Sequence, residues 1–354
     1  MAFDNRADHR ALERLRLELA WFTGRHRFAG RRTSGAGAIV RFQRVRERQG
    51  GAFAPLSADE VTPKFLDRTL RALKRWNLDI VSMDEVCRRA VTLAEKRRFV
   101  ALTFDGVTKD FITAAYPVLA LHRVPFTVYV PTAFPDGVGE AWWLGLEQVI
   151  ARESRIVLMM DDREQRFVVT DAAAKQELFV FLERWLRTLP PVELSAAIND
   201  LCRRYRVDLA ALSREAVMDW DDLAQLAADP LVTFGSATVN YSALTTVKDA
   251  AAAREMAMGK AVAESALHRE VAHFAFPFGD RVSFRRSHVV MAEEAGFASA
   301  VSTISGVVEA EGRTNLRALP RISWDGRRRS LRMMRVLLSG VAFAPVKPTG
   351  TSLD

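Results

Sequence analysis

Short apolar runs alternate with amphipathic stretches along most of this chain. The apolar runs predict strands at 39–42, 79–81, 99–104, 126–130, 231–235, 273–276 and 298–303. Apolar residues at helical spacing predict helices at 11–22, 63–73, 83–95, 248–267 and 330–338. The run 99–104 is apolar enough for a parallel strand that is covered on both faces. This alternation of strands and helices favours an α/β fold with a barrel-like architecture.

Two stretches depart from the alternation. Residues 141–226 show helical patterns throughout, most clearly at 177–189, where Pro190 and Pro191 end the helix. We therefore predict a helical insertion at about 141–226. Residues 31–38 are rich in Gly and Ser, which predicts a loop.

A single carboxylate stands out at the end of the most apolar run. Asp105 directly follows the run 99–104, and chemistry in such folds is found at the carboxyl ends of strands. Asp105 is therefore a candidate general base or a hydrogen-bond acceptor for a carbohydrate. A carboxylate that caps nearby backbone N–H groups explains the same pattern, and the sequence leaves both interpretations open.

Three segments resemble motifs of the polysaccharide deacetylases, in the same order and with similar spacing. Residues 102–110 resemble the Thr-Phe-Asp-Asp-Gly segment, 235–241 the Gly-x-His-Thr-x-x-His segment, and 274–280 the Tyr-Pro-x-Gly loop. The family is carbohydrate esterase family 4, which includes the nodulation-type chitooligosaccharide deacetylases. The resemblance implies a distorted (β/α) barrel over about 36–345. A basic helical segment at 1–35 would precede this domain, and a tail at 346–354 would follow it.

The sequence differs from the family where the family binds its metal. In the family, one Asp and two His hold zinc or a similar divalent ion, which activates water, and a second Asp acts as base. The resemblance places Asp105 at the base, and Gly106, Ala237 and Tyr241 at the ligand positions. Gly and Ala side chains have no lone pair, and a neutral phenol is a poor ligand. Gln43 also stands where a related segment has His, so the resemblance implies no metal cofactor here.

Other residues near these motifs offer further candidate sites. Six aromatic residues could form a sugar-binding surface or could belong to the ordinary core. They are Tyr241, Phe276, Phe278, Trp142, Trp143 and Trp324. Of these, Tyr241, Phe278 and Trp142, together with Pro277, are our predicted substrate-binding residues. The six His lack metal-binding spacing, and we interpret His273 as a hydrogen-bonded strand residue.

Positive charge is concentrated near the two ends of the chain. The first fifty residues hold twelve Arg against five Asp or Glu, which supplies +7 of the net charge of +8. From Arg321 onward there are six Arg and one Lys against two Asp. Basic segments attract anionic polysaccharide, nucleic acid or lipid headgroups. Because no aromatic-interleaved or helix-turn-helix pattern accompanies the charge, we expect a carbohydrate or envelope polysaccharide partner and no nucleic acid, and leave a protein partner open.

Targeting features are sparse. We find no run of about 18 apolar residues, so we expect no transmembrane helix. The first residues lack the apolar centre of a secretory signal, and Cys87 and Cys202 lie too far apart to indicate a disulfide framework. These features favour a cytoplasmic location.

Three functions are consistent with the sequence. The first is a deacetylase-like protein that has lost catalysis and retains a pocket for a glycan or a partner. The second is an active hydrolase that removes N- or O-acetyl groups from a polysaccharide or chitooligosaccharide. The third is a non-catalytic scaffold that docks through its basic termini.

Overall fold

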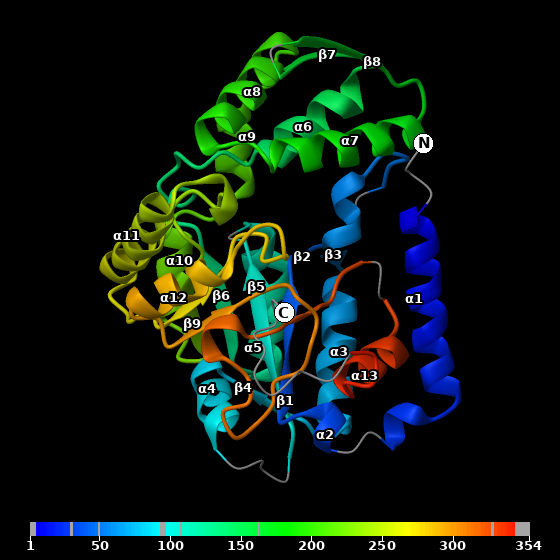
Figure 1. Cartoon of the computed structure of the whole chain (residues 1–354), viewed down its shortest axis with the longest axis vertical. Helices are drawn as coiled ribbons and strands as arrows, with labels where there is room; N and C mark the ends of the chain where they lie inside the picture. The colour runs from blue at the N-terminus through cyan, green and yellow to red at the C-terminus, as the bar shows by residue number, and fades with distance from the viewer. Residues whose placement is uncertain are drawn as a thin grey trace.

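An eight-stranded parallel sheet lies at the centre of the molecule (Figure 1). Its strand order is β11-β10-β9-β6-β5-β1-β12, and β4 also pairs with β5. The strands are β1 (Gly37–Phe42), β4 (Asp79–Val81), β5 (Phe99–Asp105), β6 (Phe126–Val130), β9 (Val232–Ser236), β10 (His273–Ala275), β11 (Ser299–Val301) and β12 (Ile322–Ser323). The structure is a computed structural model that describes residues 5–28, 31–48, 50–92, 97–106, 108–161, 163–326 and 329–343, with only the backbone at 5–11, 13, 31 and 32.

The segment before β12 joins the two edge strands of the sheet. The Leu319 N–H donates to the Ala300 carbonyl, and the Ser302 N–H donates to the Leu319 carbonyl, both at 2.9 Å. This parallel bridge links β11 to the chain that enters β12. The sheet therefore closes into a distorted (β/α) barrel, which confirms the predicted fold class.

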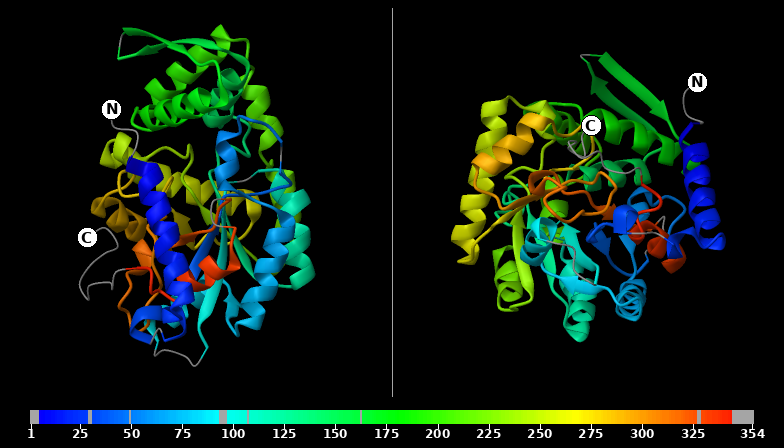
Figure 2. Two further views of the ribbon diagram at one scale, coloured as in Figure 1. Left: turned by 90° about the vertical axis from the view of Figure 1, so that its right-hand side faces the viewer. Right: turned by 60° about the horizontal axis from the view of Figure 1, so that its bottom comes forward.

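Helices surround the barrel and close one end of it (Figure 2). Around the sheet lie α3 (Pro63–Arg75), α5 (Tyr116–His122), α10 (Trp220–Ala227), α11 (Asp249–Leu267) and α12 (Arg286–Glu294). At the amino ends of the strands lies α4 (Met83–Val91), whose Met83 and Val86 belong to the same buried apolar cluster as Ala36 and Phe99. The N-terminal helix α1 (Asn5–Phe22) packs against α13 (Leu331–Leu338). Two short parallel strands, β2 (Arg44–Val45) and β3 (Glu60–Val61), follow β1.

Most element boundaries follow local sequence signals. The Thr62 hydroxyl caps α3 by accepting from the Phe65 N–H, and Ser82 caps α4 in the same way. The expected helix at 83–95 ends earlier, at Val91, because Thr92 has an extended backbone; residues 93–96 lie outside the described residues. The expected loop at 31–38 is also wrong in part. The short helix α2 (Arg31–Ser34) lies there, and β1 already begins at Gly37.

The insertion lies above the carboxyl ends of the strands (Figure 1). It contains α6 (Trp142–Arg152), α7 (Ala172–Leu186), α8 (Pro191–Arg204) and α9 (Leu209–Ala216). The expectation of an entirely helical insertion is wrong, because β7 (Arg155–Met160) and β8 (Arg163–Val168) form an antiparallel hairpin. In β7, Ile156, Leu158 and Met160 alternate with more exposed residues, which is the period of a half-buried strand. The insertion has its own apolar core.

Gly235 is required by the packing inside the barrel. A Cβ at this position would lie 2.4 Å from two ring carbons of Tyr129 and 2.8 Å from the His273 carbonyl oxygen. We expect Gly235→Ala to lower the free energy of unfolding by about 1–3 kcal/mol, because a packed interior cannot absorb the methyl group. Urea unfolding measures this, with Gly50→Ala as the control, since a Cβ at Gly50 meets nothing within 4 Å. An unchanged midpoint for Gly235→Ala would contradict this packing.

Candidate functional site

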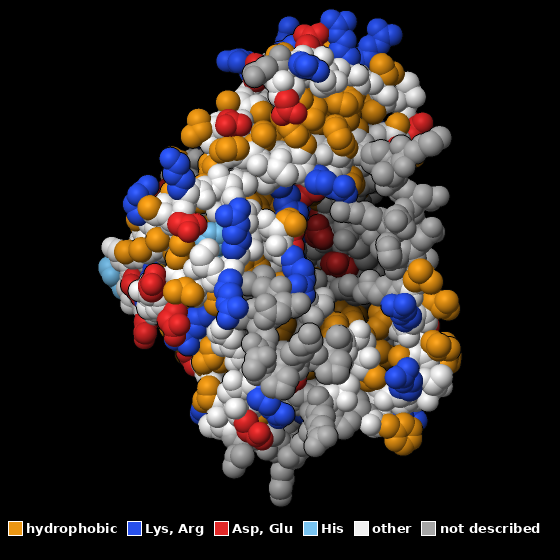
Figure 3. Space-filling model, in the orientation of Figure 1, with side chains coloured by type: hydrophobic (Ala, Val, Ile, Leu, Met, Phe, Trp, Pro, Cys, Tyr) orange, Lys and Arg blue, Asp and Glu red, His pale blue; other side chains and the backbone are white. Residues whose placement is uncertain are grey.

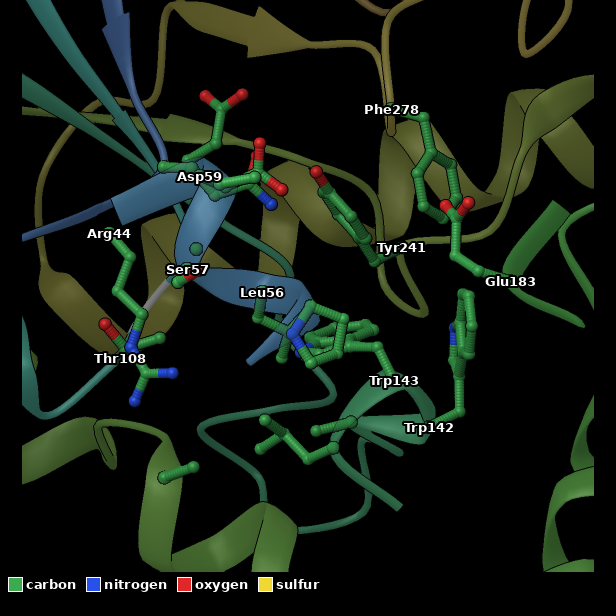
Figure 4. A pocket seen from close by; sticks show the side chains of 18 of the residues that line it. Arg44, Leu56, Ser57, Asp59, Thr108, Trp142, Trp143, Glu183, Tyr241 and Phe278 are labelled. Carbon is green, nitrogen blue, oxygen red and sulfur yellow. The ribbon is translucent and has the colours of Figure 1, made fainter. Parts of the chain in front are cut away.

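A cavity of about 600 Å³ lies between the insertion and the carboxyl ends of the strands. Its floor comes from the ends of β1 and β5, and its walls from α6, α7 and the loops that follow β9 and β10. Figure 4 shows the aromatic side chains of Trp142, Trp143, Tyr241 and Phe278 on one side of the cavity. Arg44, Ser57 and Asp59 lie on the other side.

Asp105 lies on the cavity floor and is held by two arginines. Its side chain is 6% exposed. Arg321 donates from Nη1 to Oδ1 at 2.6 Å and from Nη2 to Oδ2 at 2.8 Å. Arg41 donates from Nε to Oδ2 and from Nη2 to the side-chain oxygen of Gln43. Both carboxylate oxygens of Asp105 therefore already have charged donors.

The charges at this floor determine the ionisation of Asp105. Burial alone would raise the pKa of the carboxyl, but the positive charges of Arg321 and Arg41 outweigh it and hold this pKa below its usual range. The two guanidinium groups share one carboxylate, so these three side chains together carry one net positive charge. Arg41 lines the cavity, whereas Arg321 is fully buried.

The barrel geometry brings the two arginines to Asp105. Arg41 and Asp105 lie near the ends of the paired strands β1 and β5. Arg41 pairs with Thr103, and Asp105 follows Thr103 by two residues, so both side chains lie on the face of the sheet that points into the barrel. Arg321 lies in the segment that joins the edge strands, and its Nε donates to the Ser302 carbonyl at 2.7 Å. The residues that close the barrel therefore also supply the second partner of Asp105.

The residues at the positions where the polysaccharide deacetylases hold their metal are not suited to bind a metal ion. A Cβ at Gly106 would meet open space, so that residue contributes neither a donor nor bulk. Ala237 is buried among apolar side chains, and burial, followed by the Asp105 charge, raises the pKa of the Tyr241 phenol. Among the described residues, no cluster of three or more His, Cys, Asp or Glu is suited to a metal ion. With Asp105 already paired and Arg41 beside it, this floor does not fit a divalent cation.

The two loops that carry Tyr241 and Phe278 have strained backbones. Thr238, Tyr241 and Phe278 have φ values of 68°, 56° and 59°, in the left-handed region that non-glycine residues rarely adopt. The Glu255 carboxylate on α11 accepts from the backbone N–H groups of Val239 and Asn240, which holds the first loop. Strain of this kind persists only where neighbouring structure enforces it, and it concentrates at functional sites.

In the second loop, contacts on both sides hold Phe278 in place. The Thr303 hydroxyl donates to the Phe278 carbonyl at 2.9 Å. The guanidinium of Arg187, from the end of α7, lies 4.2 Å from the centre of the Phe278 ring. Arg187 also pairs with Asp280 at 2.5 Å, so this contact ties the insertion to the barrel loop.

A continuous series of ring contacts forms the aromatic side of the cavity. Ring centroids lie 5.9 Å apart for Phe134 and Trp143, 6.4 Å for Trp143 and Tyr241, and 5.2 Å for Tyr241 and Phe278. Trp142 lies 5.6 Å from Trp143 and is mostly buried in the insertion core. These rings form one surface that spans the insertion and the barrel.

The predicted site residues are only partly gathered at this cavity. It is lined by Asp105, Tyr241, Phe278 and Trp142, as well as by Gly106 and Trp143. Phe278, rather than the preceding Pro277, faces the cavity. Phe276 and Trp324 instead belong to the core, where Phe276 stacks on Phe284 at 4.1 Å and Trp324 packs on Phe65. Val107, next to this site, lies outside the described residues.

His273 occupies a separate polar site inside the barrel. Its ring nitrogens contact the Ser299 hydroxyl at 2.9 Å and the Asp84 carboxylate at 3.1 Å. This confirms its interpretation as a hydrogen-bonded strand residue.

Sequence reasoning missed the two arginines that define the floor. Both are charged residues inside otherwise apolar stretches, Arg41 at 37–42 and Arg321 at 318–322. A buried charge needs a partner of opposite sign, so these positions carried a usable signal. The sequence did not indicate that both would converge on Asp105.

Comparison with known proteins matches this architecture to solved structures. No protein-family model and no curated protein sequence matches the chain. The deacetylase PplD of Streptococcus pyogenes aligns with a TM-score of 0.54 and 17% identity, over 82% of this chain and 92% of PplD. IcaB from Ammonifex degensii gives 0.53 and 12%, over 86% and 98% of the two chains. BC0361, a polysaccharide deacetylase from Bacillus cereus, gives 0.50 and 11%, over 82% and 65%.

This chain has the fold of the polysaccharide deacetylases. At these identities, the likeness establishes the deacetylase fold and does not transfer a reaction. The function of the cavity therefore depends on the residues that line it.

The pairing of Arg321 with Asp105 should dominate local stability. We expect Arg321→Leu to lower the free energy of unfolding by about 3–5 kcal/mol, because it leaves the Asp105 carboxylate buried with one partner fewer. Chemical unfolding measures the loss. The control is Arg203→Leu, which breaks an exposed pair with Asp200 and should cost less than about 1 kcal/mol. Equal losses of unfolding free energy in the two variants would show that the pair of Arg321 with Asp105 adds no more stability than an exposed ion pair.

The low pKa of Asp105 should make its contribution to stability depend on pH. The folded pKa lies below the unfolded value of about 3.9, so the charged pair stabilises fully above that value. The contribution disappears as the pH falls through the folded pKa. We expect the difference in unfolding free energy between wild type and Asp105→Asn to be constant above about pH 5 and to shrink below about pH 4. A difference that grows on acidification would contradict this ionisation.

Proposed function

We propose that this protein binds a carbohydrate in the cavity of a polysaccharide deacetylase fold without hydrolysing it. The observation that carries the proposal is the state of Asp105, whose two carboxylate oxygens are engaged by Arg321 and Arg41. Beside these ion pairs, the aromatic rings of Tyr241 and Phe278 line the cavity and contact each other. The floor thus favours binding over catalysis.

The chemistry of amide hydrolysis argues against a reaction at this floor. Water is a weak nucleophile, and a general base must accept its proton in the transition state. The low pKa of Asp105 makes its carboxylate a weak base, and its hydrogen bonds to Arg321 and Arg41 oppose proton uptake. A base supplies typically about 10²–10⁴-fold in rate, which is far less than amide hydrolysis needs without an activated water.

The walls of the cavity suit a sugar. Pyranose rings present apolar C–H faces and a rim of hydroxyl groups, so they pack on aromatic rings and hydrogen-bond at their edges. Trp143, Tyr241 and Phe278 supply such rings, and Ser57 and Asp59 supply polar groups on the opposite side. This division supports a glycan in preference to a wholly apolar ligand.

Calorimetric titration with chitooligosaccharides and with fragments of acetylated exopolysaccharide tests the proposal. We expect binding to at least one of these glycans, and about tenfold weaker binding by Trp143→Ala, which removes a ring from the aromatic surface. Trp185→Ala is the matched control, because Trp185 belongs to the same insertion but does not line the cavity. Its binding should match that of the wild type.

Two results would overturn this function. Failure to bind any glycan would reject the carbohydrate ligand. Release of acetate from a bound glycan, lost in Asp105→Asn, would identify an active hydrolase instead. Elemental analysis of the purified protein for zinc then distinguishes a metal-dependent reaction from a metal-independent one.

A further inference from the structure

The outer face of α1 is an apolar surface that the barrel does not use. Leu12, Leu15, Leu19 and Phe22 follow one another at spacings of three and four residues, which places them on one side of the helix. All four are exposed, Leu15 by 64% and Phe22 by 73%. Leu17, on the opposite side, is buried in the core. The helix therefore has a second apolar stripe, and this one faces solvent.

The stripe continues past the end of the helix. A short turn at Arg25–Arg27 follows α1, and Phe28 beyond it is 86% exposed. Trp21 stacks on His26 with ring centroids 4.5 Å apart, which fixes this turn against the helix. We refer to Leu12, Leu15, Leu19, Phe22 and Phe28 as the outer stripe.

Four arginines accompany the outer stripe. Arg14, Arg16, Arg25 and Arg27 are all exposed, and none has an acidic partner among the residues the structure describes. Figure 3 shows hydrophobic and basic side chains side by side along the right-hand edge, where α1 lies. The surface is thus both apolar and positively charged.

We propose that the outer stripe docks on the surface of an anionic lipid bilayer, with α1 lying in the plane of the headgroups. Apolar side chains at helical spacing enter the boundary between headgroups and acyl chains, while arginines beside them pair with lipid phosphates. Among the described residues, no helix is long and apolar enough to cross a membrane, so α1 would lie on the bilayer. This inference is independent of what the cavity binds.

A second copy of the chain is a poorer occupant for the same surface. A twofold dimer sets each patch against its own copy, so the unpaired arginines of one chain would meet those of the other. An anionic bilayer instead supplies acyl chains for the apolar side chains and negative charge for the arginines. Charge complementarity therefore favours the lipid surface.

Co-sedimentation of the full chain with vesicles tests the inference. We expect binding to phosphatidylcholine vesicles that contain about 30% phosphatidylglycerol and little binding to pure phosphatidylcholine. The variant with Leu15→Ser, Leu19→Ser and Phe22→Ser should bind about tenfold more weakly or worse, with unchanged circular dichroism. A matched control, Val168→Ser with Val192→Ser, removes two exposed apolar side chains elsewhere and should bind like the wild type.

A second variant tests the charge by itself. Replacing Arg14 and Arg16 by Gln leaves the apolar side chains in place and should weaken binding to anionic vesicles by about fivefold for each arginine. Equal binding to both kinds of vesicle, or binding that survives the serine variant, overturns the proposal. So does a lipid-free dimer that the serine variant dissociates, because the stripe would then be covered by a second copy. Absence of binding to either vesicle also overturns it.

Discussion

The pairing of Asp105 with Arg321 and Arg41 is the interaction on which the centre of this molecule depends. A carboxylate this deeply buried is stable only with charged or multiple hydrogen-bond donors. Its partners come from β1 and from the segment that closes the barrel, so two ion pairs that share Asp105 join three separate parts of the sheet. The same segment bonds to β11 through Leu319, and the closure of the barrel and the state of its floor are therefore coupled.

The same charged side chains also set the charge at the floor of the cavity. A deacetylase fold places its cavity at the carboxyl ends of the strands, where a carboxylate can meet a ligand. Here a guanidinium lies beside that carboxylate, and the positive charge of Arg41 opposes a cation. On the aromatic side of the cavity, Glu255 and Thr303 form hydrogen bonds that hold the two loops. Fold similarity alone does not decide between binding and catalysis.

The insertion and α1 extend the barrel in different ways. The insertion has its own core and contributes Trp142, Trp143 and Arg187 to the lining of the cavity. The helix α1 contacts the core through Leu17 and leaves Leu12, Leu15, Leu19 and Phe22 exposed. The cavity and the outer stripe are therefore separate features, and the two proposed roles, glycan binding and membrane docking, do not depend on each other.

The sequence by itself determined the elements and much of their arrangement. The apolar run 99–104 was sufficient to predict a strand, because a strand buried on both faces is apolar throughout. The helical spacing at 248–267 was sufficient to predict a helix, because a helix buried on one face repeats its apolar residues with the helical period. The pattern misled at 155–168, where short alternating strands stand among strong helices and the stretch was assigned with its neighbours. Motif order also identified Asp105, Tyr241 and Phe278 as residues that share one region.

Only the tertiary structure decided what those residues do. Arg41, Asp105 and Arg321 are 64 and 216 positions apart in the chain, and no local pattern reports a contact over such separations. Likewise, Phe276 and Phe278 are nearly adjacent and both aromatic, yet the first is in the core and the second faces the cavity. The backbone between them turns through the left-handed conformation of Phe278. Local sequence encodes burial and periodicity, whereas charge pairing and the direction of a side chain depend on which distant segments the fold brings together.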